Sequence, residues 1–325
     1  MSETTKKKDN RIYGFDAIRA FSALYIMGYW HLRNYLSTAT NEAMKTHIAY
    51  QMVYFCLAGF TFISGYLIYK HHKDSIKVFF LNRVLRIYPL YLLALVSMYL
   101  THYINVKQLV LSLFGLGCFY PEKSPLTLWY VNMIILLYAL TAVLFRIPKG
   151  IYRFILAILI ESILYVLAIR LKIDERLYFF FPFYIAGLFA AERVDIKCIV
   201  DDAKNYMLIY VTIIMMCACL VLAHFTPKEF TYSTLIGSVC FIICGTAFGT
   251  LISKVKPLCT VMMALSYASM TIYMFHRCIY YIAKKAVGTM TVPTAILTIF
   301  IIIVVAYLIQ FIYDKICSVI IKGRS

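Results

Sequence analysis

Long apolar runs are the feature that most constrains the fold of this chain. One of them, AILTIFIIIVVAYLIQFIY at residues 295–313, contains no charged side chain. About 18 or more apolar residues in succession indicate a helix that crosses a lipid bilayer. Hydrophobic residues make up 62% of the 325 residues and charged residues only 14%, which is too few to cover the exterior of a soluble protein of this size. The sequence therefore predicts a protein that crosses the membrane several times.

We expect an all-α polytopic membrane protein with about ten transmembrane helices. The predicted spans are residues 13–32, 48–69, 84–104, 126–146, 151–170, 177–192, 205–225, 231–252, 258–282 and 293–313. They form a single ten-helix membrane domain (13–320), which a basic N-terminal tail (1–12) precedes and a short tail (321–325) follows. The first span lacks a small-residue cleavage site, so we interpret it as retained and not as a secretory signal.

Basic residues are distributed unequally between the two sides of these spans. The side that carries both termini holds 20 Lys and Arg residues and the other side holds 10, while Arg19 and Arg277 lie within spans. The positive-inside rule then places both tails in the cytoplasm. Because the net charge of +17 resides at span ends and in short loops, the lipid bilayer is the expected partner and nucleic acid is not.

Two further features concern packing and the outer surface. The ten cysteines are scattered without metal-ligand spacing, so we interpret them as small apolar fillers between helices and expect no metal site. The stretch 105–127 is too long for a tight loop and too short and broken for another span. It is predicted to be a partly embedded or interfacial segment on the outer side.

Arg19 and His31, which follow Asp16 on the first span, are polar residues that need an explanation. An arginine in a bilayer helix costs about 2.5–3.5 kcal/mol on insertion scales, and such charges usually line a polar cavity. Glu161 is a further intramembrane acid, for which the sequence identifies no partner.

Three other polar stretches each have a plain structural explanation beside a functional one. The arginines of RVLRIYPLY (83–91) can be ordinary cytoplasmic anchors. The aromatic residues of LWYVN (128–132) can belong to an interfacial belt, and the histidine of LSYASMTIYMFHR (265–277) can reach interfacial water. The span directions, however, place Arg83, Arg86 and Arg19 toward the cytoplasm. They place His31 and His276 toward the outside. This layering suits a phosphorylated donor that enters from inside and an acceptor that waits outside.

The same stretches resemble motifs of the acyltransferase 3 family of integral-membrane acyltransferases. The resemblance rests on five motifs in the family's order: GFDAIRAFSALYIMGYWHL (14–32), FISGYLI (62–68), FLNRVLRIYPLYLLAL (80–95), LTLWYVNMIILLYAL (126–140) and LSYASMTIYMFH (265–276). It implies ten membrane helices, acetyl-CoA or another acyl-CoA as the donor, and transfer to a hydroxyl of an envelope glycan or lipid-linked sugar. It also implies a bacterial inner or plasma membrane location, with envelope polysaccharide assembly proteins as candidate partners.

The resemblance implies roles for His31, Arg19, Arg83 and Arg86, and the remaining contacts below are our own hypothesis. His31 would be the essential histidine, and we expect it to act as a general base, because a neutral imidazole suits proton removal from a hydroxyl. Arg19 would lie deeper, near the thioester or paired with Asp16. Donor contacts are predicted at Arg83, Arg86, Lys77 and Ser64, and acceptor contacts at Trp129, Asn132, Tyr273 and His276. An acyl-histidine intermediate and direct transfer both remain open.

The chain departs from the family's pattern in two places. Eleven residues separate Arg19 from His31, where the family usually has ten. At about 100° per residue, the extra residue turns the two side chains from roughly 20° to roughly 120° apart. Either a π-bulge near Gly28 absorbs one residue, which we favour, or the two do not share a face. The fourth-span motif also lacks the acidic residue of many relatives, and Asn132 stands near its place.

A transporter or flippase for an envelope sugar or lipid-linked intermediate is the main alternative function, because proton relays also use buried Arg, His and Glu residues. Against it, the sequence has no inverted repeat and no paired Gly- or Pro-broken spans. An inactive scaffold in a polysaccharide assembly complex is a third alternative, which the intact motifs disfavour. Substrate-dependent release of free CoA distinguishes the enzyme from the transporter.

Overall fold

The computed structural model describes residues 11–69, 75–120, 127–193, 206–225 and 232–322. Within these ranges the chain is helical and contains no strand. Ten α-helices of the described part occupy the positions of the ten predicted spans: α1 (Tyr13–Tyr25), α3 (His47–Tyr69), α4 (Ile76–Leu100), α6 (Trp129–Leu144), α7 (Ile151–Leu171), α8 (Arg176–Arg193), α10 (Tyr206–Phe225), α11 (Tyr232–Ile252), α12 (Lys256–Val287) and α13 (Val292–Lys322).

Six of these helices are long and apolar enough to cross a bilayer. They are α3, α7, α11, α12, residues Leu81–Leu100 of α4 and residues Val292–Val319 of α13. The apolar segments Trp129–Leu144 of α6 and Ile209–Leu222 of α10 are shorter. The all-α, multi-pass membrane architecture is therefore confirmed, while the number of ten spans and the side of the termini stay predictions.

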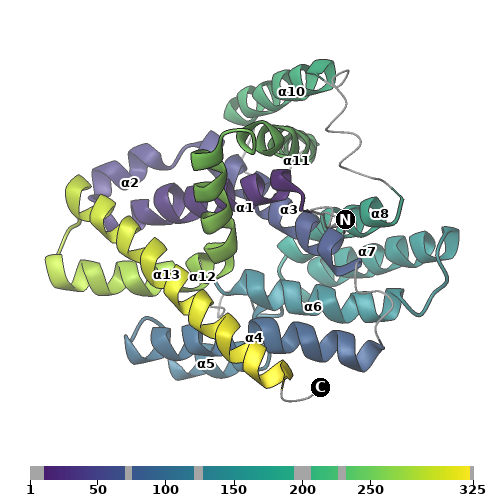
Figure 1. The fold of residues 1–325 in the computed structure, drawn as a ribbon, viewed down its shortest axis with the longest axis horizontal. Coiled ribbons are helices and arrows are strands. Elements are labelled where there is room, and N and C mark those ends of the chain that lie inside the picture. The colour runs from purple at the N-terminus through teal and green to yellow at the C-terminus, as the bar shows by residue number, and fades with distance from the viewer. Residues whose placement is uncertain (1–10, 70–74, 121–126, 194–205, 226–231, 323–325) are drawn as a thin grey trace, which may run out of the picture.

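Helix α1 lies in the middle of the bundle, where it contacts α3, α11 and α12 (Figure 1). Its approach to α11 is close because both helices present glycine at the crossing. A Cβ added to Gly14 would lie 2.4 Å from the backbone of Thr246, and one added to Gly249 would lie 2.5 Å from the Cα of Gly14. Small residues of this kind let membrane helices pack backbone against backbone. The candidate site residues of α1 are thus held by three surrounding helices.

A second close crossing joins α3 to α8. A Cβ at Gly65 would lie 2.0 Å from the carbonyl oxygen of Tyr184, and a Cβ at Gly187 would lie 2.0 Å from that of Phe62. Gly65 belongs to the FISGYL stretch, whose small residues favour close helix packing. The preceding residue, Ser64, lines a cavity, so this helix crossing also positions one wall of the candidate site.

The stretch between α4 and α6 forms a short helix, α5 (Val106–Leu113), and a 3₁₀ turn, η3 (Leu116–Cys118). Tyr88 and Tyr91 of α4 donate hydrogen bonds to the carbonyls of Leu113 and Ser112, which hold α5 against α4. Three apolar side chains at four-residue spacing are exposed: Val106, Val110 and Phe114. An apolar stripe of this kind suits a helix lying at a membrane interface, as predicted for 105–127, although residues 121–126 lie outside the described part.

Candidate functional site

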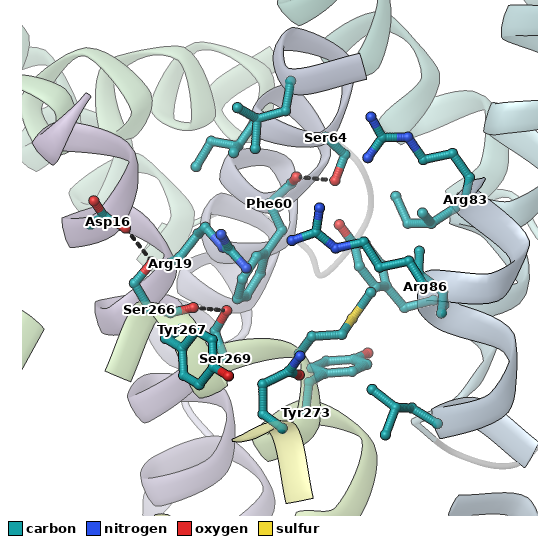
Figure 2. A pocket seen from close by; sticks show the side chains of 18 of the residues that line it. Asp16, Arg19, Phe60, Ser64, Arg83, Arg86, Ser266, Tyr267, Ser269 and Tyr273 are labelled. Atoms are coloured by element: carbon teal, nitrogen blue, oxygen red, sulfur yellow. Dashed lines mark hydrogen bonds between the residues drawn. The ribbon is translucent and has the colours of Figure 1, made fainter. Parts of the chain in front are cut away.

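A cavity of about 430 Å³ lies between α1, α3, α4, α6, α12 and α13. Figure 2 shows Arg19 projecting into it from α1, and Arg83 and Arg86 from α4. Arg11, just before α1, adds a fourth guanidinium to the wall. Helices that are distant in sequence thus bring together the basic residues that were predicted to bind the donor.

Two carboxylates also line the cavity, and each is already engaged. Asp16 accepts a bidentate ion pair from Arg11, at 2.6 Å from Nε and 3.0 Å from Nη2, and a 2.6 Å hydrogen bond from Ser266. Asp314 accepts hydrogen bonds from Tyr267 and Gln310. The lining therefore carries four cations against two occupied anions, which favours a negatively charged ligand.

Arg19 is a half-buried cation of this set that forms no ion pair within the described residues, although the Asp16 carboxylate interacts with it electrostatically. The ion pair of Asp16 is with Arg11, so the alternative that Asp16 pairs with Arg19 is not realised. Among the described residues no carboxylate lies within 4.0 Å of the Arg19 guanidinium, and Figure 2 shows that side chain directed into the cavity. Its donors are therefore available to a ligand.

The backbone beyond α1 contains the predicted π-bulge. Residues Ile26–His31 form a π-helix, and Leu32–Tyr35 continue as a 3₁₀ turn. A π-helical turn accommodates one residue more than an α-helical turn does, which absorbs the extra residue between Arg19 and His31. Gly28 lies within this segment, and the prediction of a bulge near it is confirmed.

His31 and His276 form a buried pair that contacts across 245 residues of sequence. Nδ1 of His31 lies 2.7 Å from Nε2 of His276, and the two rings are stacked with an interplanar angle of 7°. Nδ1 of His276 lies 2.9 Å from the carbonyl oxygen of Ile272. The exposed fractions are 7% for His31 and 0% for His276.

These contacts define the tautomers of the neutral pair. A carbonyl oxygen can only accept, so Nδ1 of His276 carries the proton and donates it to Ile272. Nε2 of His276 then accepts from Nδ1–H of His31. Nε2 of His31 is left with its lone pair, which is the state that a general base requires.

Tyr273 borders the cavity and also contacts the histidine pair. Its ring centroid is 6.1 Å from that of His276 and 5.4 Å from that of Tyr130, another lining residue. Its hydroxyl donates a 3.0 Å hydrogen bond to the carbonyl of Thr127. The cavity and the histidines are therefore adjacent, although neither histidine lines the cavity.

Five of the predicted site residues line the cavity, namely Arg19, Ser64, Arg83, Arg86 and Tyr273. The others do not. The backbone of Lys77 lies on α4, and its side chain lies outside the described part of the structure.

Trp129 and Asn132 are buried near the start of α6, away from the cavity wall. The guanidinium of Arg176 lies 3.7 Å from the centroid of the Trp129 ring and forms an ion pair with Asp174. Asn132 is 2% exposed. Their role as acceptor contacts stays a prediction.

Glu161 on α7 belongs neither to the cavity wall nor to the histidine pair. Within the described residues, one of its carboxylate oxygens is buried without a hydrogen-bond partner.

Sequence reasoning missed the hydrogen bonds that organise the cavity. Asp314 was a single acid after a long apolar run, a signal that could have identified it as an intramembrane polar residue. Ser266 belongs to the LSYASMTIYMFH motif, but the sequence alone assigns it no role. Its pairing with Asp16 spans 250 residues, and only the packing of α1 against α12 reveals it.

The all-α membrane bundle thus places an arginine-lined cavity, suited to an anionic ligand, beside a buried histidine pair. Comparison with protein families identifies the class. The model of the acyltransferase 3 family, described as an acyltransferase domain, matches residues 12–312. The chain belongs to this family, and we therefore treat it as a membrane acyltransferase. No curated protein and no solved structure matches the chain.

Proposed function

We propose that this protein is a membrane O-acyltransferase that moves an acetyl or similar short acyl group from cytoplasmic acyl-CoA to a hydroxyl of an extracytoplasmic or lipid-linked glycan. The observation that carries this proposal is that the wall of the arginine-lined cavity includes Tyr273, which contacts the His276–His31 pair. A cationic compartment for a phosphorylated donor thus adjoins a histidine that can accept a proton.

The cavity residues fit an acyl-CoA donor. Arginine binds phosphate through two parallel N–H donors, so Arg83 and Arg86 are suited to the CoA phosphates. A cavity of about 430 Å³ falls within the usual range for ligand sites. Ser64 and the side chain of Lys77 are further donor contacts in this proposal. Arg19, which forms no ion pair within the described residues, would face the arm that carries the thioester.

His31 performs the proton transfer in this proposal. Acyl-CoA supplies an activated thioester, and Nε2 of His31 removes the hydroxyl proton of the acceptor as its oxygen forms a bond to the acyl carbon. His31 then returns that proton to the sulfur as the carbon–sulfur bond breaks, which releases neutral CoA thiol. Nδ1–H of His31 stays bonded to His276 throughout. In the covalent variant, the same Nε2 atom would carry the acyl group.

The acceptor would meet the histidine from the outer side, where Trp129, Asn132 and Tyr273 are the proposed contacts. We place the protein in a bacterial inner or plasma membrane, as a multi-pass component that acts alone or with envelope polysaccharide assembly proteins. No metal takes part in the proposed reaction.

The test is the ester-linked acyl content of envelope glycans, measured by mass spectrometry. Cells that lack the gene are compared with cells that carry it and cells that carry His31→Ala at equal membrane abundance. We expect acyl esters with the intact gene only. Esters that persist with His31→Ala would refute the role of this histidine. Translocation of a sugar without release of free CoA would favour the transporter instead.

A further inference from the structure

Arg33 and Arg277 form a second cationic cluster, next to His31 and separate from the donor cavity. Their exposed fractions are 8% and 6%. Both interact electrostatically with His31, and they also interact with each other. Neither residue lines the cavity that holds Arg83 and Arg86. The two cations come from different parts of the chain, the 3₁₀ turn after α1 and the second half of α12.

The protein leaves the charges of this cluster largely uncompensated. Within the described residues, neither guanidinium has a carboxylate within 4.0 Å, and the Nε atom of each is buried without a hydrogen-bond partner. Arg33 stacks on Trp30 at 4.0 Å and donates a hydrogen bond to Asn41, while Arg277 donates one to Tyr103. These neutral contacts position the guanidinium groups but do not neutralise them.

One acid, Glu42, acts on Arg33 from the protein surface without forming an ion pair with it within the described residues. Glu42 interacts electrostatically with Arg33, but its side chain is 64% exposed and lies 4.0 Å from Lys45. Glu42 acts on Arg33 more strongly than Arg277 does, but its carboxylate lies at the surface, where water screens it, so it compensates Arg33 only in part. Burying two like charges together is unfavourable unless an anion joins them.

We propose that Arg33 and Arg277 bind a negatively charged group of the acceptor, a sugar carboxylate or a phosphate, and so place the acceptor hydroxyl near Nε2 of His31. This inference rests on the proposed acyl transfer and specifies its acceptor as an acidic or phosphate-linked sugar. A carboxylate or a phosphate suits both guanidinium groups because each presents paired oxygens. A neutral sugar would leave both charges unpaired and is a poorer acceptor.

The test uses the purified full-length protein in detergent, with glucuronate, glucose 1-phosphate and glucose as probes at matched ionic strength. Thermal unfolding is followed as each probe is titrated. We expect a saturable rise in Tm with one or both anionic sugars and none with glucose. Stabilisation by glucuronate alone identifies a carboxylate, and stabilisation by glucose 1-phosphate alone identifies a phosphate, such as that of a lipid carrier. No difference from glucose would overturn the proposal.

Variants locate the binding site. Arg277→Gln and Arg33→Gln should each weaken binding of the anionic probe about tenfold or more, as expected for loss of a charge-assisted hydrogen bond. Arg277→Lys should retain part of the stabilisation by the probe. The matched control is Arg170→Gln, at an exposed arginine of α7. If one glutamine variant does not fold, the other and the lysine variant still decide the question. Loss of binding in Arg86→Gln but not in Arg277→Gln would place the anion in the donor cavity and overturn the inference.

A separate measurement distinguishes failure of this inference from failure of the proposed function. Stabilisation by CoA and consumption of acetyl-CoA are recorded on the same preparation. Normal CoA binding with no preference for anionic sugars would refute the inference and leave the acyltransfer proposal intact. Anionic sugar binding without any CoA effect would refute acyl transfer from CoA.

Discussion

At the scale of single residues, the histidine pair makes the most specific prediction. His31→Ala should lower the turnover of acyl-CoA by about 10²- to 10⁴-fold, the usual contribution of a general base. His276→Ala should also lower turnover, because Nδ1–H of His31 loses its acceptor and the base nitrogen is no longer fixed. His276→Gln supplies an amide oxygen that can accept this hydrogen bond, so it should retain more activity than His276→Ala. The measurement is thiol release from acyl-CoA across a range of pH.

The pH profile separates a positioning role of His276 from a merely structural one. Loss of the acceptor should change the pH dependence of turnover, whereas a packing defect would lower turnover equally at every pH. His224→Ala, at an exposed histidine of α10, is the control and should behave like the unmodified protein. Equal activity of His276→Ala and His276→Gln at all pH values would contradict the assigned hydrogen bond from Nδ1–H of His31 to residue 276.

Arg83 and Arg86, the proposed contacts of the donor phosphates, make a second prediction at this scale. Arg83→Gln and Arg86→Gln should each raise KM for acyl-CoA, by about tenfold for a lost charge-assisted phosphate contact, with a smaller effect on kcat. This increase in KM should be smaller at high salt, because dissolved ions screen the attraction between a partly exposed arginine and the donor phosphate. Steady-state kinetics with Arg170→Gln as the control tests this. A change in kcat alone would instead assign these arginines to the chemical step.

At the scale of elements, the π-helix Ile26–His31 predicts an asymmetry between deletion and insertion. Deleting Gly28 allows this segment to become a regular α-helix, in which a separation of eleven positions still leaves Arg19 and His31 roughly 20° apart. Inserting one alanine after Gly28 adds about 100° that no further bulge absorbs. We therefore expect the deletion to keep measurable activity and the insertion to abolish it, at equal membrane abundance. Equal loss in both variants would show that the bulge has a role beyond spacing.

The crossing of α3 and α8 makes a stability prediction. Gly65→Ala forces a Cβ to within 2.0 Å of the Tyr184 carbonyl oxygen, so the helices must separate, at a cost on the order of 1–3 kcal/mol. Gly28→Ala is the matched control, because its Cβ would meet only the side chain of Ile299 at 3.7 Å. Thermal unfolding in detergent should show a lower Tm for Gly65→Ala only. An unchanged Tm would mean that the two helices adjust without loss of stability.

The bounds of the helices were largely predictable from the sequence, whereas their contacts were not. Helices α3 and α11 begin and end within a residue or so of their predicted spans, because apolar length alone determines them. The π-helix was predictable from a single extra residue between Arg19 and His31. The contact of His31 with His276 was not, because it depends on how α1 and α12 rotate against each other.

At the scale of the whole molecule, the separation of donor arginines from the histidine pair predicts that the reaction has a sidedness. Acyl-CoA does not cross a bilayer, so the cavity with Arg83 and Arg86 should accept it from the cytoplasmic face only. Inside-out vesicles should release free CoA from added acetyl-CoA, and right-side-out vesicles should not until detergent opens them. Vesicles with His31→Ala should remain inactive in every orientation. Release of CoA by sealed right-side-out vesicles alone would reverse the proposed orientation, and with it the cytoplasmic position of both termini.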